Sequence, residues 1–116
     1  MTPEGLVKRQ VCEYLSTLPG VFFWTTKTVG TYDPTRGVYR KNADRWYIRG
    51  VSDICGLLED GRFLAIELKS KTGRVSDHQK AFLENVNRMG GLGFVARSVE
   101  DVRAKLSPNG MIPGYL

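Results

Sequence analysis

DICGLLEDGRFLAIELK, at residues 53–69, is the stretch that decides the fold of this chain. The turn-forming residues EDGR at 59–62 separate two apolar segments, which predicts an antiparallel β-hairpin. Asp53 begins the first strand, and Glu67 and Lys69 end the second, so two acids and a lysine meet at one end of the ribbon. Because side chains two apart in a strand point to the same face, Glu67 and Lys69 share a face. Such charges belong either to an exposed edge strand or to a metal-dependent site that cuts phosphodiesters.

The length of the hairpin turn decides whether the two acids meet. A two-residue turn would pair Asp53 with Leu68 and would place Asp53 on the face opposite Glu67. A three-residue turn would pair Leu58 with Arg62, and Asp53 would then face Glu67 with Cβ atoms about 4.5–5.5 Å apart. We therefore predict an odd-length turn, a bulge, or an Asp53 outside regular pairing.

The flanking sequence predicts further helices and strands. Thr2-Pro3 has the form of an N-cap followed by proline, and apolar residues recur at helical spacing as far as Leu18. Ser76 and Gln79 have the Ser-x-x-Gln form of a capping box, and Ser98 precedes a last helix. The expected strands are 21–26, a segment around 46–48 that ends a long hairpin or loop over 30–50, 53–58, 63–69 and 93–96. The order α-β-(β)-β-β-α-β-α predicts one α/β domain over residues 1–116, a mixed sheet flanked by helices.

The composition is that of an ordinary globular domain. The chain has 116 residues, and 17 Lys and Arg against 12 Asp and Glu give a net charge of +5, which favours a polyanionic partner. The apolar runs are far shorter than the ~20 residues that span a bilayer, and the N-terminus lacks a signal-peptide pattern, so we expect a cytoplasmic protein that binds no membrane. Cys12 and Cys55 are expected to be reduced and partly buried, and His78 as the one histidine argues against zinc.

The chemistry of phosphodiester hydrolysis explains why these residue types occur together. The reaction needs a nucleophilic water, neutralisation of charge on the phosphoryl oxygens and stabilisation of the leaving oxygen, all of which Mg²⁺ can supply. Mg²⁺ commonly binds one or two carboxylates and completes its shell with water and substrate phosphate. Asp53 and Glu67, with a backbone carbonyl, could therefore hold it. Lys69 would lie beside the metal and stabilise negative charge developing on phosphorus.

Several segments together resemble the VRR-NUC branch of the PD-(D/E)xK nuclease superfamily, namely Gly50–Ile54, Ile66–Lys69, Lys71 with Arg74, and Ser76–Gln79. Ser52 stands where the superfamily has proline, a departure that concerns the backbone rather than the chemistry. The resemblance implies a restriction endonuclease-like fold and dependence on Mg²⁺ or Mn²⁺. It implies that Asp53, Glu67 and the Leu68 carbonyl bind the metal and that Lys69 is catalytic.

The resemblance also implies a structure-specific endonuclease acting on branched DNA in a bacterial or virus-infected host cell, with the four-way (Holliday) junction as its leading substrate. Symmetric cutting of a junction requires two active sites, so this activity implies a homodimer. A duplex nickase or restriction-like endonuclease remains an alternative, as does a non-catalytic DNA-binding module that keeps the fold. Such a module would be expected to lose a site residue, whereas Asp53, Glu67 and Lys69 are all present.

Two further residues are candidates for catalytic roles. Gln79 either caps its helix only, or also positions water or a phosphate near the helix N-terminus. The resemblance implies an acidic residue on the first helix, for which Glu13 is the candidate. The alternative for Glu13 is an exposed ion pair with Arg9, four residues earlier.

Basic side chains near the hairpin are candidates for DNA phosphate contacts. Lys71 and Arg74 follow Lys69 directly, and Arg45 and Arg49 lie in a segment that mixes cations with aromatic residues. Aromatic rings can stack on unpaired bases. We expect the two aromatic side chains between these arginines, Trp46 and Tyr47, to pack in the core instead.

Overall fold

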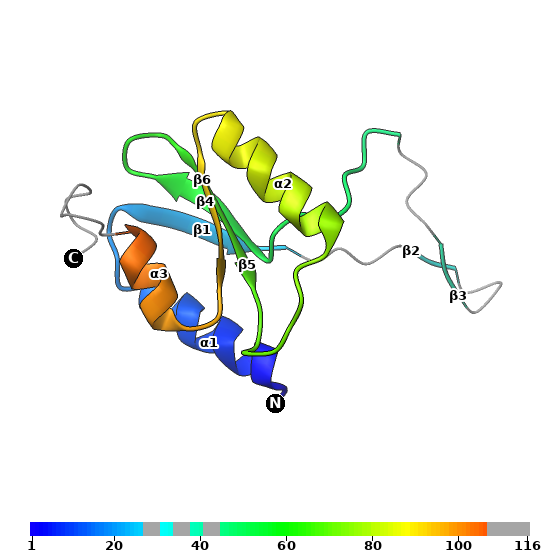
Figure 1. Ribbon diagram of the computed structural model, residues 1–116, viewed down its shortest axis with the longest axis horizontal. Helices are drawn as coiled ribbons and strands as arrows, with labels where there is room; N and C mark the ends of the chain where they lie inside the picture. The colour runs from blue at the N-terminus through cyan, green and yellow to red at the C-terminus, as the bar shows by residue number, and fades with distance from the viewer. Residues whose placement is uncertain (27–30, 34–37, 41–44, 107–116) are drawn as a thin grey trace.

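A mixed α/β fold is seen in the computed structural model, which describes residues 1–26, 31–33, 38–40 and 45–106. The main sheet has four strands in the order β1-β4-β5-β6, and β2 and β3 form a separate two-stranded sheet (Figure 1). The pairs β1–β4 and β4–β5 are antiparallel and β5–β6 is parallel. The elements are α1 (Pro3–Leu15), β1 (Val21–Thr25), β2 (Thr31–Asp33), β3 (Val38–Arg40), β4 (Ile54–Leu58), β5 (Phe63–Leu68), α2 (Asp77–Arg88), β6 (Leu92–Ala96) and α3 (Val99–Leu106).

Helices cover both faces of the main sheet. α1 and α3 pack together on one face, and α2 lies on the other face over β5 and β6 (Figure 1). The main hydrophobic core lies on the side of α1 and α3, where Leu64, Ile66 and Leu68 of β5 are fully buried. The intervening residue Glu67 therefore points toward α2. No helix in the described part of the chain has the length and apolar character needed to cross a bilayer.

The turn between β4 and β5 has three residues, an odd length, which is one of the three arrangements predicted. The Leu58 N–H donates to the Arg62 carbonyl at 2.9 Å, and the Gly61 N–H donates to the Leu58 carbonyl at 2.9 Å. Gly61 has a φ of 89°, a left-handed conformation that glycine adopts without steric cost. The strand register, continued one residue beyond the start of β4, places Asp53 opposite Glu67.

Each of the three predicted helix starts is confirmed by its cap. Thr2 Oγ1 accepts a hydrogen bond from the Gly5 N–H at 3.0 Å, with Pro3 at the first helical position. The Ser76 capping box is complete. Ser98 Oγ accepts from the Asp101 N–H at 3.2 Å at the start of α3. These local hydrogen bonds fix where α1, α2 and α3 begin relative to the strands.

Two expectations about the segment before β4 are wrong. Residues 46–48 form no strand, and the side chains of Trp46 and Tyr47 are exposed, at 75% and 41%, instead of packing in the core. The segment lies outside the four-stranded sheet and its helical layers, so its rings have no core surface to cover. The Arg45 guanidinium lies over the Trp46 ring, 4.9 Å from the ring centroid.

Candidate active site

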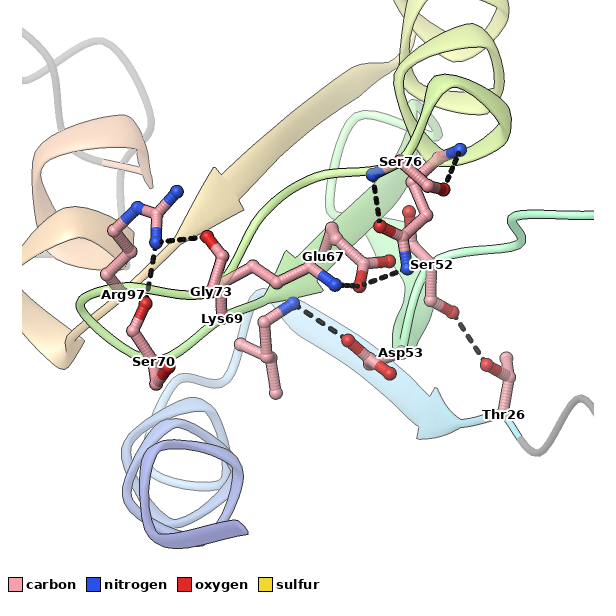
Figure 2. Close-up of polar contacts among 11 residues, drawn as sticks. Thr26, Ser52, Asp53, Glu67, Lys69, Ser70, Gly73, Ser76 and Arg97 are labelled. Atoms are coloured by element: carbon pink, nitrogen blue, oxygen red, sulfur yellow. Dashed lines mark hydrogen bonds and ion pairs between the residues drawn. The ribbon is translucent and has the colours of Figure 1, made fainter. Parts of the chain in front are cut away.

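Glu67 is a carboxylate buried at the end of β5. The residue is 1% exposed. Its Oε2 accepts a hydrogen bond from Gln79 Nε2 at 3.0 Å and lies 3.6 Å from Lys69 Nζ (Figure 2). Its Oε1 is buried and has no hydrogen-bond partner. Because burying an ionised carboxylate with an unsatisfied oxygen is costly, this side chain requires either a proton or an additional cation.

Asp53 brings a second carboxylate to the same place. Its Oδ2 accepts a hydrogen bond from the Leu68 N–H at 2.8 Å, which ties the start of β4 to the end of β5 (Figure 2). Burial, followed by the charge and hydrogen bonding of Asp53, raises the pKa of Glu67 to about 8, and Lys69 opposes this rise only in part. The Glu67 carboxyl is therefore protonated at neutral pH unless a cation lies between the two acids.

The donor set fits a divalent metal ion. Two facing carboxylates, one with an unpartnered buried oxygen, match the hard oxygen ligands that Mg²⁺ prefers. Within the described ranges, no group of three or more His, Cys, Asp or Glu side chains could hold a metal ion. Within that part of the chain, further ligands would therefore be backbone carbonyl, water or substrate oxygens. Leu68 lines the cleft beside Asp53, where its carbonyl is the expected backbone ligand.

Gln79 completes the predicted helix cap and also contacts Glu67. Its Oε1 accepts the Ser76 N–H at 2.9 Å, completing the helix cap, and its Nε2 donates to Glu67. Because the backbone N–H can bond only to the amide oxygen, the cap fixes which end of the amide faces Glu67. The start of α2 thus holds one oxygen of Glu67 in place and leaves the other unpartnered.

Gly50 is a contributor to the site that sequence reasoning did not single out. Its φ is 81°, and a Cβ atom there would lie 2.3 Å from the His78 carbonyl carbon and 2.6 Å from the Gln79 nitrogen. The chain before β4 therefore packs backbone to backbone against the first turn of α2. This contact brings Gln79 over the sheet, and its sequence signal was the glycine inside the Gly50–Ile54 segment.

Comparison with known protein families identifies the family of the chain. The VRR-NUC domain model matches residues 41–100, a little over half of the chain and all of the β4–β5 hairpin and α2. The chain belongs to the VRR-NUC family. It is therefore a member of a family of nucleases, with the mixed sheet and flanking helices compatible with a restriction endonuclease-like fold. Neither the curated proteins nor the solved structures give a match.

A cleft of about 480 Å³ opens beside Asp53 in this VRR-NUC protein. The first two turns of α1 form one wall, outside the family match, and contribute Glu4 and Lys8. Glu13 does not line this cleft, and it forms the exposed ion pair with Arg9, at 3.1 Å, that was its alternative. Glu67 does not line this cleft. The acidic residue of α1 that shares the cleft with Asp53 is Glu4. Sequence reasoning missed it because helical periodicity does not show which end of a helix faces the site.

The predicted DNA-contacting cations lie in the two chain segments that adjoin the site residues in sequence. Lys71 and Arg74 are exposed in the loop between β5 and α2, directly after Lys69. Arg45 and Arg49 are exposed in the irregular segment that leads to Gly50 and the start of α2. Their exposure leaves all four side chains accessible to a phosphate backbone.

Proposed function

We propose that this protein is a Mg²⁺-dependent endonuclease that hydrolyses phosphodiester bonds in branched DNA. One observation carries the proposal, namely the buried Glu67 carboxylate with an unpartnered oxygen beside Asp53. A protein gains no stability from two facing carboxylates in a nearly buried site, so their arrangement favours a functional role in binding a cation.

Each site residue has a distinct role in this proposal. Asp53 and Glu67 would hold Mg²⁺ or Mn²⁺, helped by the Leu68 carbonyl, and the ion when bound would neutralise phosphoryl charge and activate water. Lys69 would place a positive charge next to the phosphoryl oxygens, since its Nζ lies 3.6 Å from Glu67 Oε2 and its side chain is only 12% exposed. Gln79 would keep Glu67 oriented while the substrate binds.

The exposed segment before β4 supports a branched substrate. Branch points in DNA present unpaired or unstacked bases, on which aromatic side chains can stack. Trp46 is 75% exposed and is flanked by Arg45, so it is available for such a contact. Symmetric cutting of a four-way junction would require a second active site, and a homodimer would supply it.

Cleavage assays with defined substrates test the proposal. Four-way junction, flap, linear duplex and single-stranded DNA are incubated with the protein in Mg²⁺, Mn²⁺ or EDTA. We expect metal-dependent cutting that is strongest on branched DNA and falls at least about 100-fold in Lys69→Ala and Asp53→Asn. Arg9→Ala, at an exposed ion pair on α1, is the control and should cut like the wild type.

Three other outcomes would change the assignment. Metal-dependent cutting that survives Lys69→Ala or Asp53→Asn would place the active site elsewhere. Preferred nicking of linear duplex would favour the restriction-like alternative. DNA binding without cutting in any metal would favour a non-catalytic module.

A further inference from the structure

Arg97, the first residue after β6, is enclosed by the backbone of the loop that leaves the site. Its Nη1 donates to the carbonyls of Ser70 at 2.6 Å, Gly73 at 2.8 Å and Lys71 at 3.3 Å. Figure 2 shows the guanidinium reaching the carbonyls of Ser70 and Gly73 to the left of Lys69. The loop between β5 and α2 is therefore wrapped around a cation that comes from a different strand.

Both ends of this loop carry groups of the active site. At its start, the Lys69 N–H donates to the Ala96 carbonyl at 3.0 Å. Ala96 is the last residue of β6 and directly precedes Arg97, so the backbone of Lys69 is bonded to the neighbour of Arg97. At its end, Ser76 caps α2 and orients Gln79 toward Glu67. Both ends of the loop are therefore held by bonds that do not involve Arg97, so a change in the middle of the loop leaves the groups around the carboxylates in place.

The start of α3 holds the backbone of Arg97 in place. Its backbone N–H donates to Asp101 Oδ2 at 2.8 Å, and the Asp101 N–H donates to Ser98 Oγ at 3.2 Å at the start of α3. The guanidinium thus projects from a backbone position fixed by a helix cap. Because little freedom remains to be lost on substrate binding, the arrangement is preorganised.

Three converging carbonyls require a positive charge between them. Their oxygens carry partial negative charge and repel one another, and the Arg97 guanidinium offsets this by charge-assisted hydrogen bonds. Because its Nη1 is directed at the backbone carbonyls, this nitrogen is not placed to bind phosphate. Lys71 and Arg74 are exposed on the same loop and are free to face the solvent.

We infer that Arg97 is a positioning residue for DNA binding, which holds the Ser70–Gly73 turn in the shape that presents Lys71 and Arg74 to phosphates next to the cleaved bond. The inference rests on the proposed nuclease function for its substrate. It assigns a role to a residue that touches neither the carboxylates nor the DNA, and that acts through the loop alone.

Steady-state cleavage kinetics test the inference. We expect Arg97→Ala to raise KM for DNA about tenfold and to change kcat less than about threefold, because orientation of phosphate contacts is lost while the carboxylates stay in place. Arg97→Lys keeps a positive charge near the carbonyls but lacks the planar guanidinium. Its KM should lie between the KM of Arg97→Ala and that of the wild type. Arg88→Ala removes the same charge at the far end of α2, about 18 Å along the helix from its cap, and should leave KM unchanged.

A double-mutant cycle separates positioning from other effects. If Arg97 acts through the loop cations, Arg97→Ala should have little further effect on KM in a protein that already carries Lys71→Ala and Arg74→Ala. Independent, additive effects would overturn the inference. So would an unchanged KM in Arg97→Ala and Arg97→Lys while the wild type cuts DNA.

Amide hydrogen exchange tests the anchoring without any DNA. We expect exchange in residues 70–75 to quicken about tenfold or more in Arg97→Ala, or to a lesser degree in Arg97→Lys if the alanine variant does not fold, while β4 amides are unchanged. Unchanged exchange in the loop of the folded variants would refute the role of Arg97. If loop exchange is quicker in Arg97→Ala than in the wild type, but the wild type neither binds nor cuts DNA, the proposed function is refuted and the anchoring role is not.

Discussion

Raising the pH should destabilise the metal-free protein, and Glu67 should be the reason. Its pKa lies at about 8 in the folded state against an ordinary 4.5, because of burial and the neighbouring Asp53. A folded-state pKa above the unfolded value means that the folded protein binds the proton more tightly. The stabilisation from this proton is fully present below about pH 4.5 and is lost as the pH rises through about 8.

The pKa difference sets the size of the effect. At 1.36 kcal/mol per pKa unit, the change from 4.5 to about 8 corresponds to up to about 5 kcal/mol in the free energy of unfolding. Small domains are commonly stable by only about 5–15 kcal/mol in total, so the loss should be readily measured. Burial also raises the thiol pKa of Cys12 and Cys55 above 9.0, and restricting the range to below pH 8.5 separates them from Glu67.

Urea unfolding in EDTA between pH 5 and 8.5 measures this loss. Glu67→Gln has no group to titrate at this position, so its stability should vary much less over the same range. Added Mg²⁺ should restore stability to the wild type at pH 8 and not to Glu67→Gln, since a cation replaces the proton between the two acids. A wild-type stability that stays level or rises from pH 5 to 8 would refute the reasoning, as would an equal pH dependence in Glu67→Gln.

Three further substitutions test the surroundings of the site. Gln79→Ala removes a cap acceptor and the donor to Glu67, so we expect a loss of about 1 kcal/mol in urea unfolding and a lower cleavage rate; wild-type cleavage would contradict its place in the site. Gly50→Ala should cost about 2–4 kcal/mol, because its Cβ would meet the backbone of α2 at a φ of 81°. The matched control Gly61→Ala, at a φ of 89° with nothing within 4 Å, should cost only about 1 kcal/mol in the same thermal or urea melts. Trp46→Ala should leave stability within about 0.5 kcal/mol and weaken binding to junctions more than to duplex in a gel-shift assay, and equal weakening on both would exclude base stacking.

The features that the sequence predicts correctly are local ones. An odd-length turn is one of the predicted arrangements that place Asp53 and Glu67 on one face, and the three-residue turn is of that kind. Whether the turn length is odd or even can be reasoned from a single hairpin. The caps at Ser76 and Ser98 follow from side-chain chemistry within three residues of each helix start. Such features involve neighbours in the chain, so sequence spacing determines them.

The features that the sequence does not predict depend on tertiary packing. Nothing in the apolar pattern of α1 shows that its first turn faces Asp53. The sequence therefore gives no reason to prefer Glu4 to Glu13 as the acidic residue near Asp53. Trp46 and Tyr47 are large aromatic residues of the kind that often pack in a core. Only the folded structure, with its sheet β1-β4-β5-β6, shows that they stay exposed outside it. The three bonds from Arg97 join residues at least 24 positions apart in sequence, beyond any local signal.

The register of the β4–β5 hairpin serves the core and the carboxylate pair together, since it sets Ile54 opposite Ile66, both fully buried, and Asp53 opposite Glu67. A shift by one residue would turn Ile54 and Asp53 to the opposite face, and Asp53 would no longer add to the effect of burial, the larger cause of the rise in the Glu67 pKa to about 8. The fold instead secures the costly arrangement on three sides, through the Leu68 N–H to Asp53, and through Gln79 and Lys69 to Glu67. These contacts satisfy one oxygen of each acid and leave Glu67 Oε1 without a partner. An arrangement that is held so firmly and remains unsatisfied at one atom is what a cation-binding site requires before its ion arrives.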